Sequence, residues 1–195
     1  MIWWIGGAPC SGKSTVAGLL ARARALPLYS CDDAFERHGG PTFDKVRAMS
    51  VGERLAQPVE VQVEDVFRLG REEFPAILAD LPETGIAEGA ALLPELLDAH
   101  GVPRDRAVFV VPTEEFLRRQ YRRRAWAREL VAGTADPEGA FDRWMERDAT
   151  FARLVADQAR DLGYPVVTVD GSEGVEDIAA AVSVLFDWRR ESARP

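Results

Sequence analysis

A glycine-rich segment near the start of the chain restricts its possible folds more than any other feature. The pattern G-x-x-x-x-G-K-[ST] is met by Gly7, Ala8, Pro9, Cys10, Ser11, Gly12, Lys13 and Ser14, with Thr15 following. The apolar run Ile2 to Ile5 precedes it, and helix-forming residues from Val16 to Ala25 follow it. A strand, a glycine-rich turn and a helix in this order form the setting in which the pattern binds phosphate. We therefore expect an α/β protein with a phosphate site after its first strand.

Each residue type in this segment has a physical task. Glycines let successive backbone N–H groups converge on phosphate oxygens, and the positive N-terminus of the following helix adds to the attraction. Lys13 is one of only two lysines in the chain, the other being Lys45, while all other basic residues are arginine. Lys13 is predicted to contact the β and γ phosphates, and the Ser14 hydroxyl to ligate Mg²⁺.

Short apolar runs alternate with longer helical patterns along the chain, which is typical of a parallel sheet covered by helices. Further strands are predicted at 26–31, 84–88, 107–111 and 165–169, and helices at 34–37, 58–81, around 92–97, after 113, at 141–162 and at 175–186. The stretch at 39–41 is expected to be irregular. The length of 195 residues and a hydrophobic fraction of 47% suit one core. We expect a single three-layer α/β domain over residues 1–195.

Composition excludes several classes of protein. With 24 basic and 32 acidic residues, the net charge of −8 disfavours bulk nucleic acid and anionic membranes as partners. The chain has no Asn and only two histidines, so it contains no N-glycosylation site, no His-Glu-x-x-His zinc site and no Asn-Lys-x-Asp guanine-reading motif. His38 and His100 are interpreted as packing or surface residues. Two cysteines, Cys10 and Cys31, without an apolar leader favour the cytoplasm.

Acidic residues follow two of the predicted strands. Asp32 and Asp33 come after the second strand and Glu88 ends the third. Ligands of parallel sheets bind at the carboxyl ends of strands, and phosphoryl transfer needs carboxylates to take up a proton and to hold a metal. We predict Asp33 as the base, with Asp32 and Glu88 joining Ser14 as metal or water ligands. The alternative is that Asp32 and Asp33 cap a helix.

Arginines are concentrated in one predicted helix. Six lie within eleven residues: Arg118, Arg119, Arg122, Arg123, Arg124 and Arg128. A spacing of four places Arg118 and Arg122 on one helical face, and likewise Arg119 and Arg123. Such pairs would stabilise a phosphoryl group in transfer. The alternative is a solvated helix in an arginine-rich chain.

Four segments, taken in order, resemble those of the P-loop small-molecule and nucleotide kinases. They are Gly7 to Thr15, Asp32-Asp33, Glu88-Gly89 and the segment from Arg118. These include shikimate, gluconate and adenylate kinases, chloramphenicol phosphotransferase and 2-phosphoglycerate kinase-like proteins. The resemblance implies a P-loop NTPase fold with a five-stranded parallel sheet of order 2-3-1-4-5 and helices on both faces. It also implies ATP and Mg²⁺ as cofactors, a substrate-binding helical region at about 35–81 and an arginine-rich lid at about 113–135. Arg119 and Arg123 match the lid spacing of the family best, and Arg122, close behind, would bind the nucleotide. The loop with Gly171 and Ser172 would line the adenine.

The predicted function is ATP-dependent transfer of the γ-phosphoryl group to a hydroxyl of a small metabolite or antibiotic-like acceptor. Lys13, Asp33, Arg119 and Arg123 would be catalytic. Two alternatives stay open: an ATP-binding regulatory or partner protein without kinase activity, and a nucleotide or nucleic-acid end kinase. The sequence allows a monomer or a homodimer and predicts no membrane partner.

Overall fold

The computed structural model describes residues 1–188, and its centre is a five-stranded sheet. The strands are β1 (Ile2–Gly7), β2 (Leu28–Ser30), β3 (Gly85–Glu88), β4 (Ala107–Pro112) and β5 (Val166–Val169). They pair in the order β2-β3-β1-β4-β5, and every pairing is parallel. The predicted order 2-3-1-4-5 is therefore confirmed. Because all five strands run in one direction, their carboxyl ends share one edge of the sheet.

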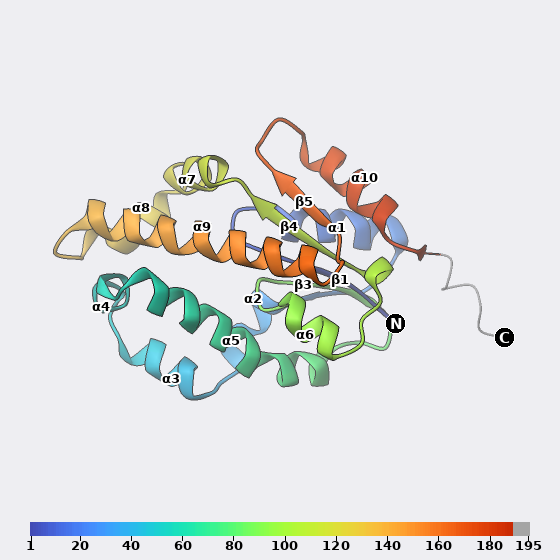
Figure 1. Ribbon diagram of the computed structural model, residues 1–195, viewed down its shortest axis with the longest axis horizontal. Helices are drawn as coiled ribbons and strands as arrows, with labels where there is room; N and C mark the ends of the chain where they lie inside the picture. The colour runs from blue at the N-terminus through green and yellow to red at the C-terminus, as the bar shows by residue number, and fades with distance from the viewer. Residues whose placement is uncertain (189–195) are drawn as a thin grey trace.

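Helices cover both faces of the sheet (Figure 1). Side chains of β1 alternate between the faces, so Trp3 and Ile5 pack in one core cluster and Trp4 in the other. The first face is covered by α1 (Lys13–Arg24) and α10 (Val175–Leu185), and the second by α5 (Val59–Asp80), α6 (Pro94–Ala99) and α9 (Pro137–Asp161). The predicted three-layer architecture is confirmed. No helix within residues 1–188 is long and apolar enough to cross a membrane.

The segment between β2 and β3 is more helical than predicted. It contains α2 (Cys31–Ala34), the 3₁₀ turn η1 (Phe35–Arg37), α3 (Pro41–Ala48) and α4 (Val51–Ala56) before α5. The expectation of an irregular stretch at 39–41 is wrong at Pro41, which begins α3. Ser50 caps α4 and forms a capping box with Glu53. Pro41 and the capping box are recognisable sequence signals for the starts of α3 and α4. Helices this short, however, lack a long apolar period.

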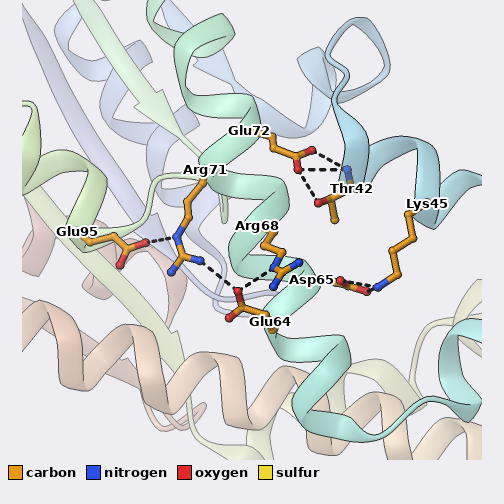
Figure 2. Close-up of polar contacts among 8 residues, drawn as sticks. All are labelled: Thr42, Lys45, Glu64, Asp65, Arg68, Arg71, Glu72 and Glu95. Atoms are coloured by element: carbon orange, nitrogen blue, oxygen red, sulfur yellow. Dashed lines mark hydrogen bonds and ion pairs between the residues drawn. The ribbon is translucent and has the colours of Figure 1, made fainter.

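Helix α3 is fastened to α5 by polar contacts, as Figure 2 shows. The backbone N–H of Thr42 donates to the Glu72 carboxylate (2.9 Å), and the Thr42 hydroxyl donates to it as well (2.5 Å). The Lys45 ammonium contacts the Asp65 carboxylate at 2.6 Å. The first turn of α3 has no side-chain cap of its own, so Glu72 supplies one from the neighbouring helix.

We expect Glu72→Ala to lower the free energy of unfolding by about 1–2 kcal/mol, because it leaves the start of α3 uncapped. Urea unfolding of the full chain measures this. Glu64→Ala is the matched control on α5, since Glu64 pairs with the exposed Arg68 and Arg71. This substitution should cost less than about 1 kcal/mol. Equal losses for both variants would contradict a capping role for Glu72.

The helix predicted after residue 113 breaks inside the arginine cluster. Helix α7 (Glu114–Arg122) ends with Arg123 at its C-cap, and Arg124 caps the start of α8 (Ala125–Ala132). The two helices pack on the first half of α9 around Tyr121, Trp144 and Met145. A second 3₁₀ turn, η2 (Arg104–Arg106), precedes β4. Arg119 thus lies within α7 and Arg123 at its C-cap in a helical conformation, so the pair spans the last turn of α7.

Candidate phosphate-binding and acceptor site

The loop from Gly7 to Gly12 joins β1 to α1 at the carboxyl edge of the sheet. Gly7 has φ +130°, and a Cβ there would collide with the backbone carbonyl of Val110. Gly12 has φ +81° and open space around it. It precedes α1 without a side-chain cap, so the first N–H groups of α1 are free of side-chain partners. The Ser11 hydroxyl is buried and unpartnered. These features fit a phosphate group bound in the loop.

Lys13, Ser14 and Glu88 come together beside this loop. The Ser14 hydroxyl donates to Glu88 Oε2 at 3.0 Å. Glu88 is 1% exposed at the end of β3, and Lys13 is 6% exposed at the start of α1. Burial raises the pKa of Glu88, while the charge of Lys13 and the hydrogen bond from Ser14 oppose that shift. Two of the predicted metal ligands therefore meet directly.

Asp32 and Asp33 lie in the first turn of α2, whose N-cap is Ser30. The Asp33 N–H donates to the Ser30 hydroxyl (3.3 Å), so Asp33 and Asp32 are not themselves the cap. Strand β2 ends earlier than predicted, at Ser30, because Cys31 already belongs to α2. Asp32 raises the pKa of Glu88 through its charge, which indicates that the two carboxylates face one region.

A cavity of about 110 Å³ adjoins Asp32. It is lined by Cys31, Asp32, Phe35, Val66, Glu73, Ala90 and Ala91, and Asp33 is not among them. Asp32 therefore borders a space in which a small group can sit, and its charge acts on Glu88. We call this space the Asp32 cavity.

Glu73 is a residue of the Asp32 cavity that the sequence reading missed. It is 3% exposed, and its carboxylate contacts His38 Nδ1 at 2.8 Å. Burial raises the pKa of Glu73, and the hydrogen bond from His38 opposes that shift. His38 is buried, as a packing residue would be, and its other ring nitrogen lies 3.5 Å from Asp80. The sequence signal that could have identified Glu73 is an acidic residue within the apolar stripe of α5, four residues before Ile77.

The arginines of the predicted lid take different positions. Arg119 donates to the backbone carbonyl of Asp170 (2.8 Å), which places it against the loop that holds Gly171 and Ser172. Arg118 pairs with Glu114 and Asp142. Arg122 and Arg123 are exposed. The structure therefore brings Arg119 together with the predicted adenine loop, whereas Arg122 and Arg123 make no such contact within residues 1–188.

The turn after β5 is preformed. The Asp170 carboxylate accepts hydrogen bonds from the Ser172 N–H (2.8 Å) and hydroxyl (2.6 Å). These bonds hold the pKa of Asp170 below its usual range.

Cys10 of the phosphate loop, at φ +61°, packs against the cluster of α7, α8 and α9. The phosphate loop thus contacts the predicted lid segment directly.

A metal bound here would take its protein ligands from few side chains. Within residues 1–188, no three His, Cys, Asp or Glu side chains are grouped as a metal site. The Ser14 hydroxyl and the Glu88 carboxylate are hard oxygen donors, which Mg²⁺ prefers, and it commonly takes its remaining ligands from water and substrate phosphates. The donor set fits Mg²⁺ bound together with a nucleotide.

No protein-family model and no curated protein matches the sequence. Among solved structures, shikimate kinase from Bacteroides thetaiotaomicron is similar with a TM-score of 0.53 at 17% identity, over 95% of this chain and 97% of that chain. Shikimate kinase from Acinetobacter baumannii, in complex with shikimate, gives a TM-score of 0.50 at 18% identity, over 99% and 94%. At such identities the likeness concerns the fold. Strand order, the position of the phosphate loop and these similarities together show that the chain has the fold of the P-loop small-molecule kinases.

Proposed function

We propose that this protein is an ATP-dependent phosphotransferase that phosphorylates a hydroxyl group of a small molecule. The observation that carries the proposal is that Asp32 lines a cavity and that its charge acts on Glu88. Glu88 in turn accepts a hydrogen bond from Ser14 and is affected by the charge of Lys13. A phosphate loop alone binds nucleotide, whereas a carboxylate-lined cavity next to it offers a place for an acceptor.

Each residue takes a role set by its position. Lys13 would contact the β and γ phosphates, and the backbone of residues 7–15 would cradle them. Ser14 and Glu88 would hold Mg²⁺, which when bound neutralises charge on the phosphate oxygens. Asp32 would accept the proton of the acceptor hydroxyl, because it lines the cavity. The role of base, which we predicted from the sequence for Asp33, is thus proposed for Asp32.

Arg119 would act at the nucleotide end of the site, together with the loop of Gly171 and Ser172. Arg122 and Arg123 are exposed, and they would reach a phosphoryl group only if the segment 113–135 closes over it. Closure would also exclude water and so suppress hydrolysis of ATP.

The proposal is tested by incubating the protein with Mg²⁺, ATP and a panel of small hydroxyl compounds, with products read by mass spectrometry. A new phosphorylated compound is expected. Tight ATP binding without any product across the panel would favour the alternative of a regulatory ATP-binding protein. Phosphorylation of an oligonucleotide end would favour the nucleic-acid kinase, which the net charge of −8 disfavours.

Asp32→Asn is expected to reduce kcat with the acceptor found in this screen by about a hundredfold or more, because it removes the proton acceptor. Asp33→Asn is the matched control, one residue away and equally charged, and it should stay within a few-fold of the wild type. ATP affinity should change little in either variant. A large loss in Asp33→Asn with an active Asp32→Asn would return the base to Asp33.

A further inference from the structure

A second, smaller cavity lies among α3, α4, α5 and α9. Its volume is about 80 Å³, and its polar lining consists of Arg54, Gln57, Gln62, Asp65 and Arg147. Val66 lines both this cavity and the Asp32 cavity, so one residue borders the two. Whole small-molecule pockets are usually about 300–1,000 Å³, so this space fits one terminal group of a ligand. We call it the Arg54 cavity.

Two polar atoms at this cavity are buried and have no hydrogen-bond partner. They are Arg54 Nε, a donor, and Gln62 Oε1, an acceptor. The orientation of the Gln62 amide is fixed by its other end, because Nε2 donates to the carbonyl oxygen of Gln57 at 2.8 Å. A carbonyl partner requires the NH₂ group, so the oxygen is the free atom. Buried polar groups are rarely left unpaired, and this pair is complementary to a ligand that both accepts and donates.

The cavity also has uncompensated positive charge. No ion pair within residues 1–188 involves Arg54. Arg147 is held by Asp148 (2.7 Å), and the one lining carboxylate, Asp65, is held by Lys45 (2.6 Å). Burial and the charge of Arg147 lower the pKa of Arg54, so the two guanidinium groups oppose each other. An anion between them would relieve that repulsion.

We propose that the Arg54 cavity binds an anionic group that carries a neighbouring hydroxyl. The anion accepts hydrogen bonds from Arg54 and Arg147, and the hydroxyl donates to Gln62 Oε1. A carboxylate next to a hydroxyl and a monohydrogen phosphate both have this chemistry. If the proposed phosphotransferase function holds, this group is one end of the acceptor, and the hydroxyl to be phosphorylated lies across Val66, at Asp32.

The binding test uses small probes, with ADP present in excess so that the phosphate loop is occupied. Glycolate carries the anion and the hydroxyl, acetate only the anion, and ethylene glycol only hydroxyls. We expect glycolate to bind several-fold more tightly than acetate, and ethylene glycol not to bind measurably by NMR titration. Inorganic phosphate forms a separate arm. If phosphate binds more tightly than glycolate, the acceptor is identified as a phosphate ester. If glycolate binds more tightly, the acceptor is identified as a hydroxy acid.

Variants separate the two contacts. Arg54→Met should weaken both glycolate and acetate on the order of tenfold. Gln62→Met should leave acetate binding unchanged and remove the advantage of glycolate. Arg68→Met is the matched control, because Arg68 lies on α5 but is exposed and paired with Glu64. Circular dichroism and ADP affinity confirm that each variant folds.

Wild-type glycolate affinity in Arg54→Met would overturn the proposal, as would equal binding of glycolate and ethylene glycol. A glycolate advantage that survives in Gln62→Met would overturn the assignment of the hydroxyl. Failure of the proposed function is read separately, in the ADP titration and the acceptor screen. Arg54-dependent binding of glycolate without ADP binding would leave the cavity assignment standing and remove only the kinase.

Discussion

Lys13→Ala is expected to lower ATP affinity and to reduce phosphoryl transfer by about a hundred- to a thousandfold. Lys13 is 6% exposed at the first position of α1, and its charge acts on Cys10 of the phosphate loop and on Glu88 before any ligand arrives. Such a preorganised charge needs no rearrangement when negative charge develops on the transferred group. Removing it also leaves Glu88 without the cation that favours its ionised form, so the pKa of Glu88 should rise further.

Equilibrium dialysis with ATP and the product assay measure the two effects of Lys13→Ala. Lys45→Ala is the matched control for ATP affinity, because Lys45 is the other lysine of the chain and pairs with Asp65 away from the phosphate loop. ATP affinity should be unchanged in Lys45→Ala. Unchanged ATP affinity in Lys13→Ala would contradict the nucleotide site.

Asp148→Ala is expected to lower the free energy of unfolding by about 3–5 kcal/mol, because it removes a buried carboxylate that accepts from three donors. Asp148 is 3% exposed on α9 and accepts hydrogen bonds from the Tyr121 hydroxyl (2.8 Å), Trp144 Nε1 (3.1 Å) and Arg147. The variant would leave two buried donors without a partner and one guanidinium without its counter-charge. Loss of these hydrogen bonds should also loosen the packing of α7 against α9.

Urea denaturation of three variants tests this prediction. Asp142→Ala is the control on the same helix, because Asp142 is 67% exposed and pairs with Arg118 at the surface, where ion pairs contribute about 0–1 kcal/mol. Asp148→Asn keeps an acceptor oxygen and should lose less than Asp148→Ala. A loss below about 1 kcal/mol in Asp148→Ala would show that the three donors find other partners.

The positions of the strands were predictable because their signals are local and strong. β1 is an apolar run that ends in a glycine pattern, and β4 is apolar throughout. Family resemblance supplied the order, which no single strand contains. Helix α3 escaped prediction because its start is capped by a residue distant in sequence, Glu72, which accepts from Thr42. Helix α4 has a local capping box but is short. A helix of six or eight residues is too short for a clear apolar period.

The candidate site was predictable where chemistry follows from spacing along the chain. The glycine pattern located Lys13 and Ser14, and the end of β3 located Glu88. The choice between Asp32 and Asp33 depends on which side chain a single helical turn directs into a cavity, and a sequence does not settle that. Glu73 and Asp148 were missed because each lies within an apolar stripe, and the period of such a stripe is defined by its apolar residues alone.

The two edges of the sheet are short strands. β2 has three residues at one edge and β5 has four at the other. An edge strand offers unpaired backbone groups to another chain, and its length sets how many hydrogen bonds a second sheet can form with it. Edges this short give a poor template for strand addition. If two copies of this chain associate, we expect the contact to be made by helices, so dimerisation would leave the sheet and its carboxyl edge unchanged.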